Sequence, residues 1–314
     1  MEAFPPLFLE RLRKIIPEED FPAVLENFSK EKILCARVNT LKNSGKEVAA
    51  VLREHNILFR EVPWYREALF IPREAKEDLE KTGLACEGKI FPQSLSSLLP
   101  VLVLDPQPGE NVLDMCAAPG GKTAQMAAHM NNSGTIIALE RVKDRYYRLK
   151  SVLSLLGVEI TESKLMDARR FRADGILFDK ILVDAPCSTE GRFRAGDKKS
   201  FAYWSPRKIK EMSHKQKGLL LVASRLLKDK GSLVYSTCTF SPEENEEVID
   251  WLLRKTGGAM RVVPVKFEGV KTYPTASSWG KKTFSDEIVS CVKVLPTDTM
   301  EGFFIAKLAK RKRG

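Results

Sequence analysis

The feature that most constrains the fold of this chain is an alternation of strand and helix patterns that begins near residue 90. Such alternation predicts a doubly wound, mostly parallel sheet with helices on both faces, which binds ligands at the carboxyl edge of its strands. Ser241 and Glu244 predict a capping box for the last helix. We expect strands at residues 111–116, 135–140, 159–166, 180–184, 232–236, 261–265 and 303–307, and helices at residues 122–130, 143–156, 206–228 and 242–255.

Residues 1–90 predict a separate small α+β domain. Residues 5–28 have a helical pattern that is interrupted at Pro17. Because no pattern here has catalytic spacing, we expect this domain to guide or hold a partner and place a boundary after residue 90. Within the domain we expect strands at residues 33–38, 57–62 and 68–71 and a helix at residues 46–54.

Composition excludes several classes of protein. Apolar residues make up 43% and charged residues 29% of the 314 residues, which is typical of a soluble globular chain. No apolar run reaches the roughly 18 residues of a membrane span, and the acidic N-terminus lacks the pattern of a signal peptide. We therefore expect a cytoplasmic protein with no membrane contact. We also expect a monomer.

The cysteines and histidines argue against metal binding. The six cysteines are at least 30 residues apart, and the three histidines form no H-E-x-x-H pattern, so neither a zinc site nor a disulfide framework is expected. Lone cysteines are usually small core residues, which is our interpretation of Cys35, Cys86 and Cys291.

Charge is distributed unevenly along the chain. Residues 1–90 carry 15 Lys and Arg against 16 Asp and Glu, whereas the remainder carries 36 against 25, a net charge of +11. Such asymmetry suggests a polyanionic partner, most often nucleic acid, although a basic enzyme with a solvated tail would look the same.

The most informative motif is CAAPGGKT, residues 116–123, where a strand runs through a turn into a helix. Gly120 and Gly121 would let a ligand approach the backbone closely. The end of the motif resembles a phosphate-binding loop, but that pattern requires glycine at position 116, which is Cys116.

Three acidic residues, Glu140, Asp167 and Asp184, end successive predicted strands at this edge. A carboxylate in the position of Glu140 commonly binds the ribose hydroxyls of an adenosine-bearing cofactor, and Asp167 could accept from an adenine amino group. Two further strands each end in a cysteine, Cys187 or Cys238, and such thiols can act as nucleophiles.

The segment from Gly191 to Trp204 mixes basic and aromatic residues. This mixture suits phosphate contact and base stacking, and the alternative is a solvated loop with Trp204 packed inward. The residues that we expect to contact RNA are Arg192, Arg194, Lys198, Lys199 and Trp204.

Together, CAAPGGKT, DAPCS (184–188) and STCTFSPEENE (236–246) resemble the RNA cytosine-5 methyltransferases of the Nop2/Sun family. RVNTLK (37–42), FPQSLSSLLP (91–100) and GFFIAKL (302–308) are similar to further segments of that family. The resemblance implies a Rossmann-like class I methyltransferase with a seven-stranded, mostly parallel sheet in residues 91–314. It also implies S-adenosylmethionine as cofactor and 5-methylcytosine formation in structured RNA, either rRNA or tRNA.

The resemblance also implies roles for individual residues. Cys238 is the nucleophile, Cys187 assists product release, Asp184 holds the pyrimidine, and Lys122 points toward the substrate. The implied cofactor residues are Cys116, Ala117, Ala118, Pro119, Gly120, Gly121, Lys122, Glu140, Arg145, Asp167 and Asp184.

The chain departs from the family pattern at Val152, Leu155 and Thr297. These departures bear on how the RNA is bound, and so on which RNA is the substrate. Two other functions are compatible with parts of the sequence. A DNA cytosine-5 methyltransferase would attack with Cys187, but the lead-in segment and the Thr-Cys-Thr turn around Cys238 argue against it. A non-catalytic RNA-binding factor would not need both thiols and all three acids.

Overall fold

The computed structural model describes residues 4–312. These residues form two compact units: unit 1 combines residues 4–31 with 183–312, and unit 2 comprises residues 32–182. The predicted boundary after residue 90 stays a prediction. Within the described residues, no helix is both long and apolar enough to cross a membrane.

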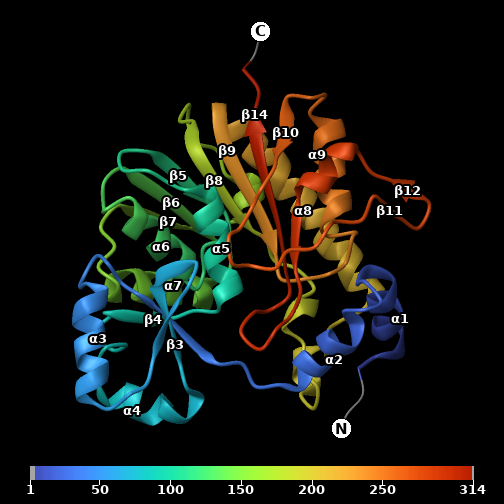
Figure 1. The fold of residues 1–314 in the computed structure, drawn as a ribbon. Coiled ribbons are helices and arrows are strands. Elements are labelled where there is room, and N and C mark those ends of the chain that lie inside the picture. Colours follow the sequence, from blue (N-terminus) through green and yellow to red (C-terminus); the bar gives the residue numbers. More distant parts are fainter. Residues whose placement is uncertain (1–3, 313–314) are drawn as a thin grey trace. The chain divides into compact units, whose positions relative to one another are not determined.

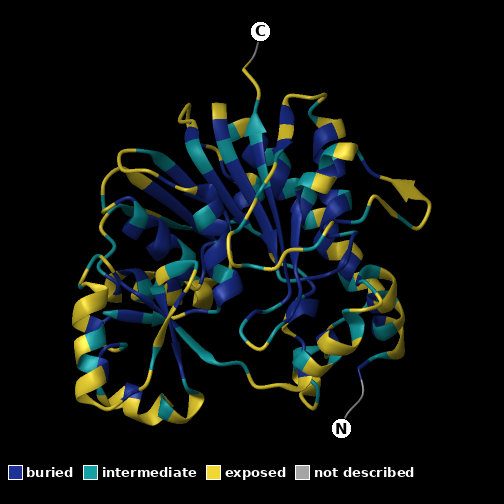
Figure 2. Cartoon of the chain, viewed as in Figure 1, coloured by how far each residue is buried: buried dark blue, intermediate teal, exposed yellow. Residues whose placement is uncertain are grey.

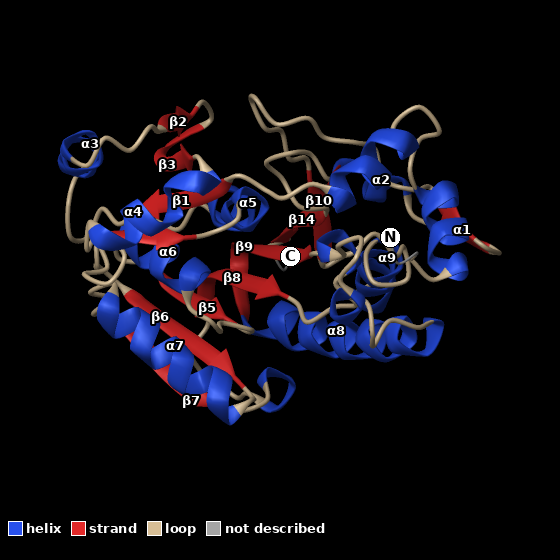
Figure 3. Cartoon of the chain, turned by 90° about the horizontal axis from the view of Figure 1, so that it is seen from below, coloured by secondary structure: helices blue, strands red, loops and turns tan. Residues whose placement is uncertain are grey.

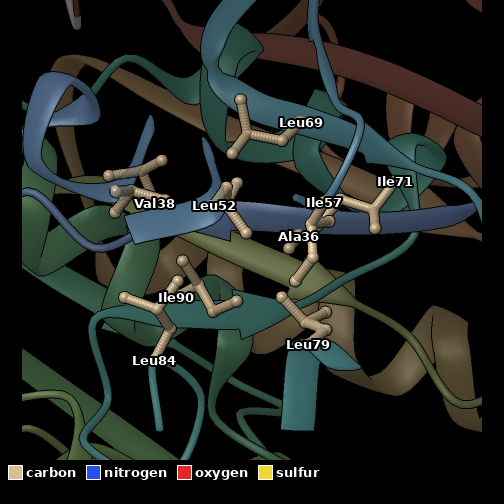
Figure 4. Close-up of a cluster of buried hydrophobic side chains, with 10 residues drawn as sticks. Ala36, Val38, Leu52, Ile57, Leu69, Ile71, Leu79, Leu84 and Ile90 are labelled. Atoms are coloured by element: carbon tan, nitrogen blue, oxygen red, sulfur yellow. The ribbon is translucent and has the colours of Figure 1, made fainter. Parts of the chain in front are cut away.

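The first part of unit 2 is a four-stranded antiparallel sheet with the order β2-β3-β1-β4. Figure 1 labels strands β3 and β4 of this sheet. Its apolar side chains, among them Val38, Leu52, Ile71 and Ile90, pack against one another (Figure 4). The predicted strands and the helix near residue 46 are confirmed. The elements are β1 (Leu34–Val38), α3 (Gly45–Glu54), β2 (Arg60–Val62), β3 (Tyr65–Ile71), α4 (Lys76–Lys81) and β4 (Ile90–Pro92).

The second part of unit 2 is parallel, with the strand order β8-β5-β6-β7. Helix α7 packs along β6 and β7 (Figure 3), as the alternating pattern predicts. Helix α5 was not predicted. The elements are α5 (Leu95–Leu104), β5 (Asn111–Asp114), α6 (Gly121–His129), β6 (Thr135–Glu140), α7 (Lys143–Leu155), β7 (Thr161–Leu165) and β8 (Phe178–Asp184).

Strand β8 carries the chain into unit 1, where β14 pairs antiparallel with both β9 and β10. β13 pairs with the start of β14. The elements of unit 1 are α1 (Pro6–Ile15), α2 (Phe21–Ser29), α8 (Pro206–Leu226), β9 (Leu227–Thr237), α9 (Glu246–Lys255), β10 (Met260–Val263), β11 (Ser278–Trp279), β12 (Lys282–Thr283), β13 (Val292–Val294) and β14 (Phe303–Lys310).

The start of α9 differs from the prediction. The helix begins at Glu246 with Asn245 as its N-cap, and no side chain caps it, so the predicted capping box is wrong. The Ser241 hydroxyl donates instead to Glu190, and the Glu244 carboxylate accepts from Ser188 and Gln216. The side chains of Ser241 and Glu244 therefore bond to residues distant in the sequence and do not cap the helix.

Helices α1 and α2 pack on an aromatic cluster within unit 1. Phe8 contacts both Phe193 and Trp204, and the backbone N–H of Ala195 donates to Phe28 O. The outer faces of α1 and of α3 in unit 2 are exposed (Figure 2). The N-terminal helices therefore pack against the 193–204 loop.

In unit 2, Asn39 of the RVNTLK segment joins the antiparallel sheet to the end of α7. Its fully buried amide donates to Gly88 O at 2.7 Å and to Leu156 O at 2.8 Å. Gly88 has a positive φ, and a Cβ there would lie 2.1 Å from Leu155 O, so this approach requires glycine.

We predict that Asn39→Ala lowers the free energy of unfolding by about 1–3 kcal/mol, because two buried carbonyls lose their donors. Gln107→Ala is the matched control, since that exposed amide bonds only Asp105, and it should change stability by less than about 0.5 kcal/mol. Urea denaturation followed by circular dichroism measures both. Equal midpoints for the two variants would contradict the role of Asn39.

Candidate active site

The turn that follows β5 in unit 2 is fixed by the buried side chain of Asp114. Its carboxylate accepts from the backbone N–H of Cys116 at 3.3 Å and from the Thr123 hydroxyl at 2.8 Å. The N–H of Ala117 donates to Leu139 O, which ties the turn to β6. Residues 116–121 are therefore held between two parallel strands at their carboxyl edge.

Packing and backbone conformation require both glycines of this turn, while the close approach of a ligand stays a prediction. Gly120 has a φ of +114°, and a Cβ on it would lie 3.1 Å from Leu149 and 3.2 Å from Val152 of α7. A Cβ on Gly121 would lie 2.7 Å from the Phe91 ring. Packing against the protein and a left-handed backbone thus demand glycine here.

Glu140 ends β6, as predicted, and its side chain is 4% exposed. One carboxylate oxygen accepts from the N–H of Val142 at 2.8 Å, and the other lies 3.7 Å from Arg145. Arg145 also donates to Ala118 O at 2.8 Å, so it links the acid to the turn. Lys122 donates to Ser97 of α5 at 2.7 Å.

Asp167 lies two residues beyond β7 instead of ending it. It caps a short 3₁₀ helix, and its carboxylate accepts from the guanidinium and the backbone N–H of Arg169. The hydrogen bonds from Arg169 lower the pKa of Asp167 to about 2. This carboxylate is therefore ionised at neutral pH and already paired.

In unit 1, Cys187 and Cys238 come together with their sulfur atoms 3.4 Å apart. The backbone N–H of Ala185 donates to Ser236 O at 2.9 Å, and each cysteine lies two residues beyond this bond. The Ser236 hydroxyl donates to Asp184 at 2.8 Å. The two thiols therefore converge as expected, and Asp184 is linked to the residue two positions before Cys238.

The two thiols have different surroundings. The adjacent Cys238 sulfur and burial raise the pKa of Cys187, while the N–H of Thr189 acts in the opposite direction. Thr189 has a φ of +60°, which is uncommon for a β-branched residue and is typical of functional sites. Because its pKa is raised, Cys187 is a neutral thiol near pH 7.

Arg192 lies next to this pair, and its guanidinium is 3.4 Å from Glu301. The carboxylate of Glu301, followed by the nearby groups of Cys238, Cys187 and Asp184, raises the pKa of Arg192. A cation is therefore within electrostatic range of both thiols, a placement that its prediction as an RNA contact did not include.

The other predicted RNA contacts divide into two groups. Arg194, Lys198 and Lys199 are exposed, whereas the ring of Trp204 packs on Phe8 and its N–H donates to Glu190. Stacking of Trp204 on a base stays a prediction. The neighbouring Tyr203, which was not among the predicted RNA contacts, is 87% exposed.

Two buried glutamates near the thiols were missed. Glu190 accepts four hydrogen bonds, and Glu244 accepts from the N–H of Ser188 and from Gln216, while burial raises the pKa of Glu244 to about 8. The sequence signal that could have identified them is the presence of acidic residues close to the cysteine-bearing motifs.

Of the predicted core cysteines, Cys291 is buried, but Cys86 is exposed and that prediction is wrong.

No cluster of three or more potential metal-binding side chains occurs between residues 4 and 312.

Residues 101–309 match the family described as 16S rRNA methyltransferase RsmB/F, and residues 4–87 match its ferredoxin-like domain.

Curated relatives extend over nearly the whole chain. A tRNA (cytosine(49)-C(5))-methyltransferase of Pyrococcus abyssi is 39% identical over 96% of this chain and 95% of its own length. The ribosomal RNA small subunit methyltransferase F of Klebsiella pneumoniae is 35% identical over 98% of this chain, which spans 64% of that relative.

A solved structure described as a methyltransferase homolog protein from Pyrococcus horikoshii is also similar. It is 32% identical, with a TM-score of 0.80 over 98% of this chain and 100% of that one. The predicted Rossmann-like methyltransferase fold with a small N-terminal domain is therefore confirmed.

We predict that Cys238→Ala lowers the pKa of Cys187, because it removes the largest cause of the elevation. The pH at which iodoacetamide alkylates Cys187 at half its maximal rate should move down. Mass spectrometry of the labelled peptide measures this, with the exposed Cys86 as an internal reference that should not move. An unchanged or higher midpoint for Cys187 would contradict the interpretation.

Proposed function

The chain belongs to the RsmB/F family of Nop2/Sun-type RNA cytosine-5 methyltransferases, and on that premise we propose that it forms 5-methylcytosine in rRNA or tRNA through a covalent cysteine adduct. The observation that carries the covalent mechanism is the pair of sulfur atoms 3.4 Å apart beside Asp184.

S-Adenosylmethionine is the proposed methyl donor, and its chemistry is an electrophilic methyl group on a sulfonium sulfur. The donor set in unit 2 fits this cofactor. Glu140 presents a buried carboxylate for the ribose hydroxyls, and the turn at 116–121 is held rigid by Asp114. The proposed cofactor site also includes Asp167, which is paired with Arg169. Arg145 belongs to it as well, because its guanidinium donates to Ala118 O in the turn.

The proposed chemistry begins with a thiolate. C5 of cytosine is a poor nucleophile, so a thiolate first adds to C6, and the resulting enamine-like ring is methylated at C5. A base then removes the C5 proton, the C6–S bond breaks, and the thiolate leaves with its electron pair. Asp184, bonded to Ser236, would hold the N3/N4 edge of the pyrimidine.

The electrostatics support a division of labour. A nucleophile must be a thiolate, and the raised pKa of Cys187 keeps that residue neutral, which favours Cys238 for the attack. Arg192 offers a positive charge to stabilise the thiolate form. Cys187 is then the residue that assists release.

Structured RNA is the proposed substrate. Arg194, Lys198 and Lys199 project from the loop that follows Cys187, and positive side chains of this kind bind phosphates. Exposed Tyr203 adds an aromatic face on which a base can stack.

The decisive experiment is transfer of a tritiated methyl group from S-adenosylmethionine to total RNA and, separately, to DNA. We expect label in RNA alone, as 5-methylcytosine after nuclease digestion. Label in DNA, in another nucleoside or in neither polymer would overturn the proposal.

We predict that Glu140→Ala weakens S-adenosylmethionine binding by about 1–3 kcal/mol, because charge-assisted hydrogen bonds to the ribose are lost. Isothermal calorimetry on the folded variant measures the change. Glu162→Ala, which removes an exposed carboxylate of β7 in the same unit, is the control and should bind normally. Unchanged affinity in Glu140→Ala would remove Glu140 from the cofactor site.

The two cysteines should give opposite phenotypes. We predict that Cys238→Ala abolishes methyl transfer and any covalent adduct. Cys187→Ala should still attack but release slowly, so that a protein–RNA complex accumulates that survives denaturing electrophoresis. The double variant should form none. Adducts in Cys238→Ala and none in Cys187→Ala would assign the attack to Cys187.

A further inference from the structure

The loops that carry the two thiols meet at one buried carboxylate, that of Glu190. The side chain is 2% exposed and lies three residues beyond Cys187 in a short 3₁₀ turn. The proposed chemistry gives it no role in bonding to the pyrimidine or to the cofactor. Its environment therefore needs a separate explanation.

All four hydrogen bonds to Glu190 come from protein donors. One oxygen accepts from the Thr239 hydroxyl at 2.8 Å and from the N–H of Phe240 at 3.0 Å. The other accepts from the Ser241 hydroxyl at 2.8 Å and from the Trp204 indole N–H at 2.7 Å. Three of these donors are on the three residues that follow Cys238.

Further bonds join the same two loops. The N–H of Gly191 donates to Cys238 O at 2.9 Å, and the hydroxyls of Ser188 and Thr239 are 2.7 Å apart. Gly191 also packs closely on Gly302, because a Cβ on Gly191 would lie 2.2 Å from Gly302 O. These contacts leave the turn little room to shift.

We propose that Glu190 is a positioning residue that fixes the separation of the Cys187 and Cys238 sulfur atoms and couples it to the 193–204 loop through Trp204. This inference rests on the proposed function, which it deepens. A carboxylate is suited to this role because it accepts at both oxygens, whereas the amide of glutamine would direct N–H groups toward two of the four donors. Buried donors without acceptors would then push the loops apart.

A first test needs no RNA. Phenylarsine oxide bridges two neighbouring thiols, forming two As–S bonds and releasing one water from its oxygen and the two thiol protons. Wild-type protein should bind it tightly, and Cys238→Ala should not. We expect Glu190→Gln to bind it at least about 10-fold more weakly, because the sulfur atoms no longer keep their separation.

Glu243→Gln is the matched control, since it makes the same change in the loop that follows Cys238 but at a carboxylate that pairs with Arg11 and not with the Glu190 donors. It should bind phenylarsine oxide like the wild type. Glu190→Asp, which keeps both acceptor oxygens, should recover part of the affinity. Thermal unfolding followed by circular dichroism reports whether each variant is folded, including unit 1, which contains Glu190 and Glu243.

The second test measures methyl transfer to RNA. We expect Glu190→Gln to lower kcat by about 100-fold while KM for RNA changes less than about 3-fold, with partial rescue in Glu190→Asp. Wild-type kcat and arsenical binding in a folded Glu190→Gln variant would overturn the inference. Absence of methyl transfer in the wild type would instead refute the proposed function, and arsenical binding would still decide the role of Glu190.

Discussion

One backbone hydrogen bond, from Ala185 N–H to Ser236 O, sets the register on which the thiol pair depends. Cys187 and Cys238 each lie two residues past it, in the loops that follow β8 and β9, and their sulfur atoms are 3.4 Å apart. The bond from Ser236 to Asp184 uses the same register.

Beyond the strands, buried acids replace the ladder of hydrogen bonds. Loop backbone cannot pair as strands do, and an unpaired buried carboxylate is costly, so these acids accept hydrogen bonds from donors of neighbouring segments. Asp114 holds the turn after β5, and Glu244 accepts from the N–H of Ser188. Glu190 accepts from Trp204, in the segment after Cys187, and from Thr239, in the segment after Cys238. We infer that these hydrogen bonds keep the separation of the two sulfur atoms fixed.

The elements that sequence predicted well are those with a strong local period. Strand β6 has its predicted bounds, and α7 begins at Lys143 as expected, because alternating burial and amphipathic spacing are properties of a few neighbouring residues. Helix α5 was missed because it is buried on nearly every side and contains Pro100, so it shows no polar face. The start of α9 was wrong because distant residues bind its expected capping side chains.

The sequence by itself determined the alternating fold, the turn at 116–121 and the two cysteines that follow strand ends. Each of these features depends on residues that are neighbours in the sequence. Only the tertiary structure decided that Trp204 packs inward, that Gly121 makes room for Phe91, and that Glu190 joins both thiol loops. Glu190 and Phe240 are 50 residues apart in the chain. Hydrogen bonds and packing across such separations depend on which surfaces folding brings together, and no local pattern encodes them.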